Sequence, residues 1–367
     1  MKTDQIQKVH KDWYKLDLSA IVYPTLQRRD FSSVYRLSVL LKEDIDPEIL
    51  QRAVNLTMPR FPTYKAAIRK GVFWRYLEPN DRPGPFVQED VKNPCQPMHF
   101  KGNNRYLVRI YYYRNRIALE AHHSLGDGTG GMCVLQTLTA TYLRLKGHSE
   151  IENGGFVLDI LGIPDPGELE DAYMKYANAK VCPPRPGEKT YRVRGTKEPF
   201  YTLNIIDGIM SVSEVMRVAK SYNATITEYL NSVLLYALMR KQESEWHLKL
   251  RPVKIAMPVN LRRFFPSRTL RNFITMIYPG IDPRLGEYTF EEIVTQVHNY
   301  MRYYLNEKLL RGDITTNAET QRNPFIRIVP LFIKDLVVRQ FYTKIQDKNS
   351  SAGLTNMGAL KVPETMK

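Results

Sequence analysis

Hydrophobic and polar positions in the first part of the chain alternate with the two-residue period of strands, interrupted by stretches of helical period. Asp46 and Pro47 predict the start of one helix. An aspartate can accept hydrogen bonds from free backbone N–H groups, and proline suits the first helical position. The predicted elements are a strand over 31–42, a helix from 47 to about 58, a hairpin over 63–77, strands over 105–113 and 116–123, and a helix over about 130–146.

A stretch rich in glycine and proline, residues 149–195, separates this part from a second mixture of strands and helices. Thr225 with Glu228, and Thr289 with Glu292, have the spacing of capping boxes and predict two helix starts. The predicted elements are a short helical piece near 168–179, strands over 200–206, 253–259 and 273–281, helices over 225–241, 289–306 and 326–342, and an extended segment over 350–356.

These elements predict an α+β protein of two sandwich lobes. A chain of 367 residues exceeds what one hydrophobic core usually serves, so two lobes are expected from length as well. We expect an N-terminal lobe over residues 1–170, a connection over 171–198 and a C-terminal lobe over 199–367.

Composition narrows the classes of function. No run of about 18 apolar residues occurs, and residues 1–10 are polar with no apolar stretch of signal-peptide type after them. The sequence therefore predicts no transmembrane segment and a cytoplasmic location. The three cysteines, Cys95, Cys133 and Cys182, are scattered and predict neither a disulfide framework nor a zinc site.

The formal net charge of +15 indicates an anionic partner without choosing one. Lysine and arginine are spread along the whole chain rather than gathered in one stripe, so no nucleic-acid partner is predicted. A phosphate-bearing cosubstrate, an acidic carrier protein and an anionic membrane surface remain open.

The candidate chemistry lies in residues 120–128, where two adjacent histidines end a strand and an Asp-Gly pair opens the next turn. Alternation along a strand places His123 on the apolar face and turns His122 to the other face. Burial at the end of an apolar row favours the neutral imidazole, which is the form that a general base needs. We predict that His123 is the catalytic base and that His122 packs inside its own lobe.

Three neighbours support this prediction. Asp127 follows across a tight turn, where it could orient the imidazole or pair with an arginine and fix the turn. Gly128 permits a backbone geometry that a Cβ would obstruct. The hydroxyl of Ser124 could donate to an oxyanion, or serve only the turn.

Two other kinds of site fit this run less well. His122 and His123 point to opposite faces and cannot easily chelate one ion, so no metal site is predicted. Three glycines match the GxGxxG pattern of dinucleotide-binding turns, but Asp127 inside the turn would repel a pyrophosphate. These glycines are Gly126, Gly128 and Gly131.

The run from His122 to Gly128 matches HHxxxDG and resembles the signature of the condensation-domain, alcohol acetyltransferase and chloramphenicol acetyltransferase-like superfamily of CoA-dependent acyltransferases. Three later segments extend the likeness over nearly the whole chain. Residues 257–262 resemble the PVNxR stretch of the second lobe, residues 271–273 resemble the asparagine that follows it, and residues 355–358 resemble the SNxG segment. The stand-alone, bacterial alcohol acetyltransferase-like branch is the most similar.

The resemblance implies two chloramphenicol-acetyltransferase-like α/β sandwich lobes arranged in a V, with a channel between them. His123 then corresponds to the catalytic histidine, and Asp127 to an aspartate that pairs with a second-lobe arginine, here Arg262. Asn272 and Asn356 are candidate substrate-binding residues. Family members usually continue beyond the SNxG segment, so we expect the last strands of the second lobe, and the strand that crosses to the first lobe, to be missing.

The implied reaction moves an acyl group from a thioester to an alcohol or amine by direct attack, without a covalent enzyme intermediate. No bound cofactor is expected, and acyl-CoA is the expected cosubstrate. Its phosphates would meet a basic group of residues. These are Arg262, Arg263, Arg268 and Arg271.

Two rival functions stay open at this stage. One is a condensation-type enzyme that uses substrates bound to an acyl carrier protein, and the other is a binding or scaffold protein that has lost activity. The acyl chain length, the acceptor and the oligomeric state do not follow from the sequence.

Overall fold

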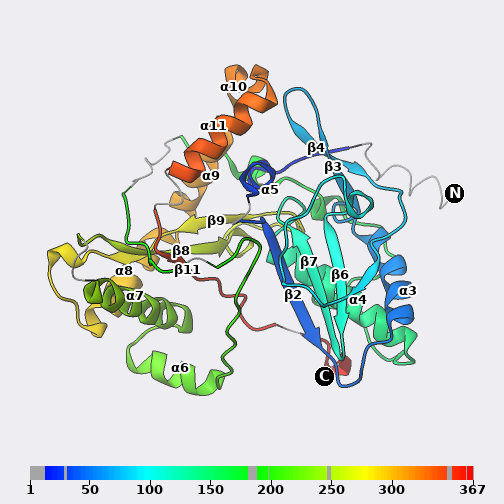
Figure 1. Cartoon of the computed structure of the whole chain (residues 1–367), viewed down its shortest axis with the longest axis horizontal. Helices are drawn as coiled ribbons and strands as arrows, with labels where there is room; N and C mark the ends of the chain where they lie inside the picture. Colours follow the sequence, from blue (N-terminus) through cyan, green and yellow to red (C-terminus); the bar gives the residue numbers. More distant parts are fainter. Residues whose placement is uncertain are drawn as a thin grey trace.

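The computed structural model describes residues 13–28, 31–180, 188–196, 198–245, 249–344, 349–360 and 362–366. Its mixed helices and sheets form two lobes that lie side by side (Figure 1). Within the described ranges, no helix combines the length and the apolar character needed to cross a bilayer.

The first lobe is built on a four-stranded sheet in the order β2-β7-β6-β5. The helices α3 and α4 pack on it, and a second, three-stranded sheet in the order β1-β4-β3 completes the lobe. The side chain of Asp46 accepts hydrogen bonds from the backbone N–H groups of Glu48 and Ile49, as predicted for the start of α3. The elements are β1 (Tyr14–Lys15), α2 (Tyr23–Leu26), β2 (Val34–Leu40), α3 (Pro47–Thr57), β3 (Ala66–Lys70), β4 (Arg75–Pro79), β5 (Val87–Glu89), β6 (Val108–Tyr113), β7 (Arg116–His122) and α4 (Gly128–Leu145).

The second lobe is organised around β8, whose inward residues are buried in alternation. This strand pairs antiparallel with β9 and β10 and parallel with β11. Both predicted capping boxes are present, at the starts of α7 and α8. The elements are α6 (Val212–Ser221), α7 (Ile226–Ser244), β8 (Val253–Asn260), β9 (Ile274–Ile277), β10 (Gly280–Ile281), α8 (Phe290–Tyr304) and β11 (Ala352–Gly353).

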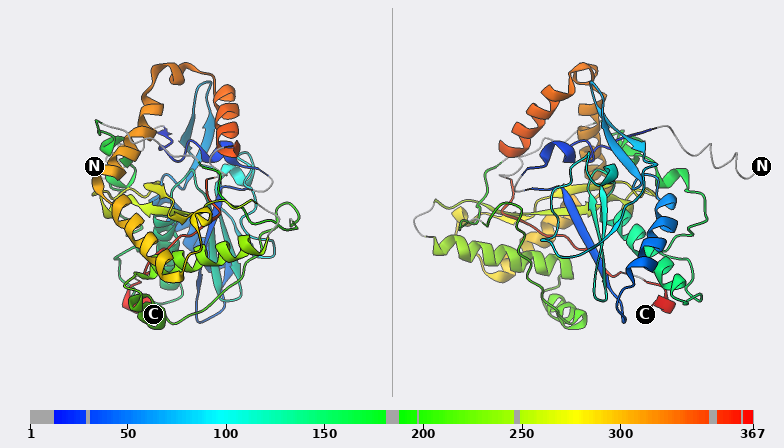
Figure 2. Two further views of the ribbon diagram at one scale, coloured as in Figure 1. Left: turned by 90° about the vertical axis from the view of Figure 1, so that its left-hand side faces the viewer. Right: turned by 45° about the vertical axis from the view of Figure 1, so that its right-hand side comes forward.

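Three further helices project from the body as an arm above the junction of the lobes (Figures 1 and 2). They are α9 (Glu307–Arg322), α10 (Pro324–Ile328) and α11 (Leu331–Lys344). α9 packs against the short helix α5 (Ala172–Tyr176), and α11 packs against α2 of the first lobe.

Hydrophobic clusters follow this arrangement. One fills the first lobe, and Leu270 of the second lobe is part of it. A second surrounds β8 between the sheet and helices α7 and α8. A third joins α5 to α9 through Phe265 and Phe273. The expected domain boundaries stay predictions, but the lobes clearly share buried residues.

Three predictions about elements need correction. Residues 200–206 form no strand. First-lobe side chains bind part of this segment instead, as in the bond from the Leu203 N–H to Asn93 Oδ1 (2.7 Å). The helix predicted over 326–342 is two helices, because Pro330 disfavours the helical conformation at Val329. Helices α6 and α9 were not predicted.

The path of the segment after β11 was not predicted. It runs from the second lobe to the first, where Met366 packs against a small cluster of Ala140, Ile151 and Val157 (Figure 1). Met357 on this path lies against Gly128. The chain therefore does cross between the lobes, although residues 354–360 and 362–366 contain no strand.

Candidate active site

The turn between β7 and α4 lies at the junction of the two lobes. β7 ends at His122, and the His123 backbone N–H donates to the carbonyl of Ser33 (2.9 Å). Antiparallel pairing of β7 with both β2 and β6 fixes the direction in which the chain leaves the sheet. The histidine pair is thus held at the end of a central strand of this sheet, with a helix beginning five residues further on.

The imidazole of His123 is clamped between two aromatic rings. Tyr23 of α2 stacks on it with ring centroids 4.8 Å apart, and Tyr35 of β2 lies at 4.6 Å on a tilt of 45°. The residue is partly exposed, while its Nδ1 atom is buried without a hydrogen-bond partner.

Burial lowers the pKa of His123 to about 4. The Asp127 carboxylate and the Gly126 backbone act in the opposite direction, but desolvation is the larger effect. The ring is therefore neutral near pH 7, in the state that can accept a proton.

Asp127 points to α4 and to the second lobe. Its Oδ1 accepts the N–H groups of Thr129 (3.1 Å) and Gly130 (3.3 Å), which caps the helix. Its Oδ2 accepts from Arg262 Nη1 (2.8 Å) and from the Phe273 N–H (3.0 Å). Of the two roles left open by the sequence, the contacts favour the pairing with an arginine that fixes the turn.

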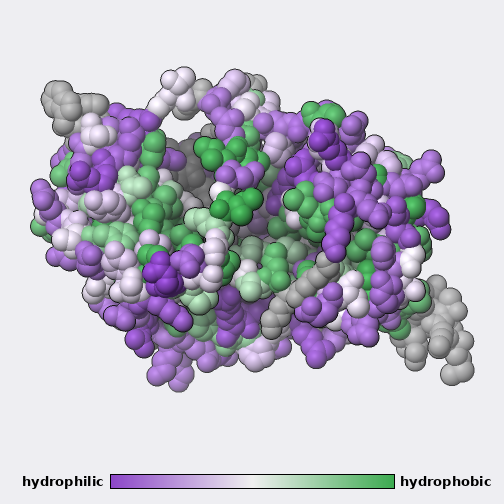
Figure 3. All heavy atoms as spheres, turned by 90° about the horizontal axis from the view of Figure 1, so that it is seen from below, coloured by the Kyte–Doolittle hydropathy of each residue, from purple (hydrophilic) through white to green (hydrophobic). Residues whose placement is uncertain are grey.

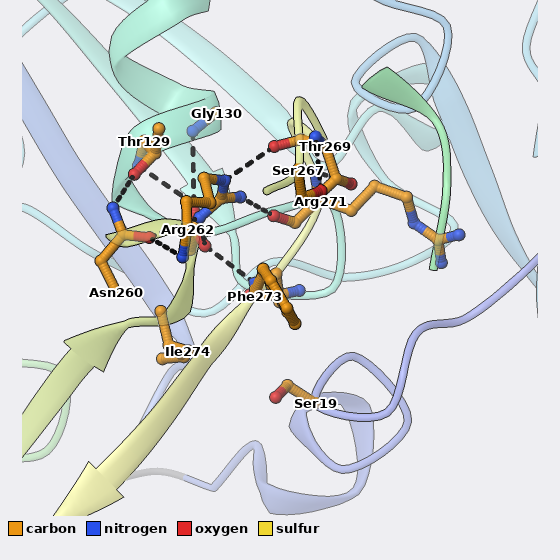
Figure 4. Close-up of polar contacts among 12 residues, drawn as sticks. Ser19, Thr129, Gly130, Asn260, Arg262, Ser267, Thr269, Arg271, Phe273 and Ile274 are labelled. Atoms are coloured by element: carbon orange, nitrogen blue, oxygen red, sulfur yellow. Dashed lines mark hydrogen bonds and ion pairs between the residues drawn. The ribbon is translucent and has the colours of Figure 1, made fainter. Parts of the chain in front are cut away.

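Arg262 pairs with Asp127, as the resemblance implies. Its other N–H groups donate to acceptors of its own lobe. Nε donates to the Thr269 carbonyl (2.9 Å) and Nη2 to the Arg271 carbonyl (2.6 Å). Nη1 also donates to Asn260 Oδ1 (3.2 Å). Figure 4 shows Arg262 at the centre of these contacts, which hold the loop after β8 in shape.

The glycines of the turn serve close packing. A Cβ on Gly130 would lie 2.0 Å from the Leu270 carbonyl oxygen, and one on Gly126 would lie 2.5 Å from it. Gly128 does not have the special backbone geometry we expected, because its φ is not positive. A glycine is favoured at position 128 because of limited space, since a Cβ there would lie 3.1 Å from the Met357 side chain.

Asn272 is placed beside the histidine but is fully buried. Its Nδ2 donates to the His123 carbonyl (2.8 Å) and to Asp17 Oδ2 (3.2 Å). A substrate cannot reach a side chain enclosed in this way. The expected substrate contact is therefore replaced by a positioning contact.

Two other predicted site residues lie apart from the ring. The Ser124 hydroxyl is fully buried and donates to the Ala20 carbonyl (3.4 Å), so it does not face a substrate. Asn356 is exposed on the second lobe, where its Nδ2 donates to Thr227 Oγ1 (2.8 Å).

His122 packs inside its own lobe, as the alternation of side chains predicted. It is fully buried, meets the ring of Phe100 edge to face, and accepts the Ser124 N–H at Nδ1 (3.2 Å). Burial, with a smaller contribution from His123, lowers the pKa of His122 to about 3.

Three of the four arginines expected to bind phosphate are already paired with groups of the protein. Arg262 binds Asp127. Arg271 is buried and donates to the Lys15 carbonyl (2.5 Å). Arg268 is exposed and pairs with Asp165 (3.3 Å). Arg263 is exposed beside Gly358 and is the member of the set for which no polar contact is seen among the described residues.

Tyrosines near the ring were missed by sequence reasoning. The Tyr35 hydroxyl lies 3.2 Å from the Tyr64 hydroxyl and donates to the Asp127 carbonyl (3.2 Å). Burial raises the pKa of both tyrosines, so they stay neutral. Tyr35 falls on a predicted strand, but nothing in the pattern indicates that its ring reaches His123.

The surface between the lobes is hollowed, and hydrophobic residues gather around the hollow (Figure 3). A separate cleft of about 730 Å³ lies where α11, the chain after α2 and the 96–99 loop meet. Within the described residues, no group of three or more metal-ligating side chains is present. The cleft is lined by Gln27, Arg28, Gln96, His99, Tyr201 and Arg339, among others.

Comparison with known proteins identifies the fold of this chain through solved structures only. No protein-family model matches the chain, and no curated protein matches it. Solved structures match over most of its length. Polyketide synthase associated protein 5 from Mycobacterium tuberculosis has a TM-score of 0.54 at 14% identity, covering 96% of this chain and 81% of that one.

Two further structures agree. TRI101 of F. graminearum, complexed with coenzyme A and T-2 mycotoxin, has a TM-score of 0.55 at 11% identity, over 96% of this chain and 88% of that one. The first condensation domain of the calcium-dependent antibiotic synthetase, with a substrate analogue, has a TM-score of 0.56 at 16% identity, over 82% and 76%. This chain has the chloramphenicol-acetyltransferase-like α+β fold. The resemblance seen in the sequence is thereby confirmed for the architecture.

The close packing at the turn makes a testable prediction. Gly130→Ala should destabilise the protein by about 1–3 kcal/mol, because backbone of the second lobe must move to admit the methyl group. Gly154→Ala is the matched control, since a Cβ there meets nothing within 4 Å. Urea unfolding of both variants measures the difference, and equal midpoints would contradict the close approach.

Proposed function

We propose that the protein is an acyltransferase that moves an acyl group from an acyl-CoA-type thioester to an alcohol or amine. His123 is the general base. The observation that carries the proposal is the neutral, partly exposed imidazole at the lobe junction, clamped between Tyr23 and Tyr35. The complexes of TRI101 with coenzyme A support a thioester of this kind as the donor.

In the proposed reaction, Nε2 of His123 takes the proton of the acceptor hydroxyl or amine while the acceptor attacks the thioester carbonyl. The tetrahedral oxyanion then collapses and releases the thiol. Asp127 does not touch the ring. It holds the turn that presents His123, together with Arg262 and Asn272.

The cleft lined by Arg28 and Arg339 is the proposed position of the phosphate-bearing part of the donor. Arg28 of this cleft follows the end of α2, the helix that carries Tyr23, by two residues. Two basic side chains on its wall suit a diphosphate.

A condensation-type reaction on carrier-bound substrates is the second candidate. The matches to condensation domains favour it, and the same base would serve. A donor panel of acyl-CoA and acyl carrier protein thioesters separates the two. A protein that has lost activity would release thiol from neither.

His123→Ala should lower the acceptor-dependent rate by about 10²–10⁴-fold, the usual contribution of a general base. The measurement is free-thiol release from a panel of acyl-CoAs offered with mixed alcohols and amines. His148→Ala, which changes an exposed histidine outside the site, should keep the wild-type rate. Wild-type turnover in the His123 variant, with unfolding unchanged, would refute the assignment.

The acid limb of the pH–rate profile should reflect the lowered pKa of His123. Because its pKa is about 4, the rate should hold from neutral pH until the pH approaches 4 and then fall as the ring is protonated. The unfolded chain binds protons on the histidines near pH 6.5, so folding stability also declines from there toward pH 4. Circular dichroism at each pH separates the two effects. A rate that halves near pH 6.5 in folded protein would contradict the proposal.

A further inference from the structure

The α10 and α11 part of the arm carries an apolar surface that is exposed to solvent. Phe325 is 79% exposed and Phe332 is 74% exposed. The β3–β4 turn continues this surface with Val72 and Trp74, which are 70% and 51% exposed. We call the following set the arm face: Val72, Trp74, Phe325, Phe332, Leu336 and Val337.

The arm and the turn are one continuous structure. The Leu331 N–H donates to the Val72 carbonyl (2.8 Å), and Lys334 Nζ donates to the Phe73 carbonyl (2.8 Å). Figures 1 and 2 show the arm standing beside the β3–β4 hairpin. The exposed apolar side chains of the turn and of α11 therefore lie on two elements that contact each other.

Helix α11 has the reverse polarity of an ordinary surface helix, with charged residues toward the protein and apolar residues toward solvent. Residues Leu331, Lys334, Asp335 and Val338 recur with helical spacing and are only partly exposed. Asp335 accepts Thr25 Oγ1 (2.8 Å) and Arg75 Nη1 (2.8 Å), so the acidic group points to the protein. The opposite stripe, which meets solvent, holds Phe332, Ile333, Leu336 and Val337. An exposed apolar surface of this kind indicates a site that binds another protein or a membrane.

The charges around the arm face are of one sign. Arg327 of α10, Arg339 of α11 and Lys70 at the end of the strand before the turn are exposed, whereas Lys334 points to the protein, where its Nζ donates to the carbonyls of Phe73 and Arg327. The one acidic residue of α10 and α11 is Asp335, whose carboxylate is bound to Arg75. A mixture of exposed aromatic and aliphatic side chains with lysine and arginine suits the boundary of an anionic bilayer, where apolar groups enter and cations meet lipid headgroups.

We propose that the arm face docks the protein on the surface of an anionic lipid bilayer. The helices are too short to cross it, so they lie in its interface. A second copy of this chain fits less well, because bringing two such faces together would also bring their cations together.

The arm is connected to the candidate active site. Asp335 binds Thr25 of α2, and the same one-turn helix presents Tyr23 to His123. Arg339 of α11 lines the cleft described above. A protein docked by this face would therefore hold its cleft close to the bilayer. The docking itself does not depend on the proposed reaction.

Sedimentation with sucrose-loaded vesicles tests the proposal with the full-length protein. Vesicles of phosphatidylcholine alone are compared with vesicles that also contain phosphatidylglycerol. We expect binding to the second kind, weakened by salt. The double variant F332E/L336E should bind at least about tenfold more weakly, because it removes apolar contact and adds negative charge.

The matched control is the double variant L161E/L285E, which places the same charges at two leucines that are 89% and 81% exposed elsewhere. It should bind as the wild type does. Phe325→Glu, in α10, is an independent test should the double variant not fold. Equal vesicle binding by the arm and control variants would overturn the proposal, as would failure of the wild type to bind. So would a wild-type dimer that F332E/L336E converts to a monomer, since the face would then bind a second copy.

Discussion

The carboxylate of Asp127 joins the two lobes at the candidate site. One oxygen caps the first turn of α4, and the other receives both Arg262 and the Phe273 N–H of the second lobe. Both side chains are nearly removed from water, at 5% exposed for Asp127 and 11% for Arg262. Removing one partner of such a pair leaves the other charge buried and uncompensated, which is why the contact constrains everything around it.

The neighbouring groups are arranged to fit that contact. Glycines at positions 126 and 130 let the Leu270 backbone approach the turn, and Leu270 itself enters the first-lobe core. Asp17, whose pKa is raised by burial against the opposing effect of Arg271, holds Asn272. Asn272 in turn binds the His123 carbonyl. The imidazole is thus positioned by its backbone and by flanking rings, while its own Nδ1 remains without a partner.

Much of this was predictable from local sequence. The strand before the histidine pair, the capping boxes and the glycine-rich turn all follow from residue type and spacing, and the HHxxxDG resemblance led to the fold and to Arg262. The roles of Asn272 and Ser124 were not predictable, because their burial depends on how the lobes meet. Tyr23 and Tyr35 reach His123 through tertiary packing that no periodicity encodes. The strand expected at 200–206 failed because strand formation needs a neighbouring ladder, and the side chains of Asn93 and Gln96 bind that segment instead.

A double-mutant cycle on Asp127→Asn and Arg262→Gln tests the central claim, that one ion pair couples the lobes at the site. The free energy of unfolding in urea is measured for the wild type, both single variants and the double variant. The account predicts a coupling free energy of about 1–3 kcal/mol between the two positions, as for groups in direct contact. Effects that add to within about 0.5 kcal/mol would show that the two side chains do not interact, and would contradict the account.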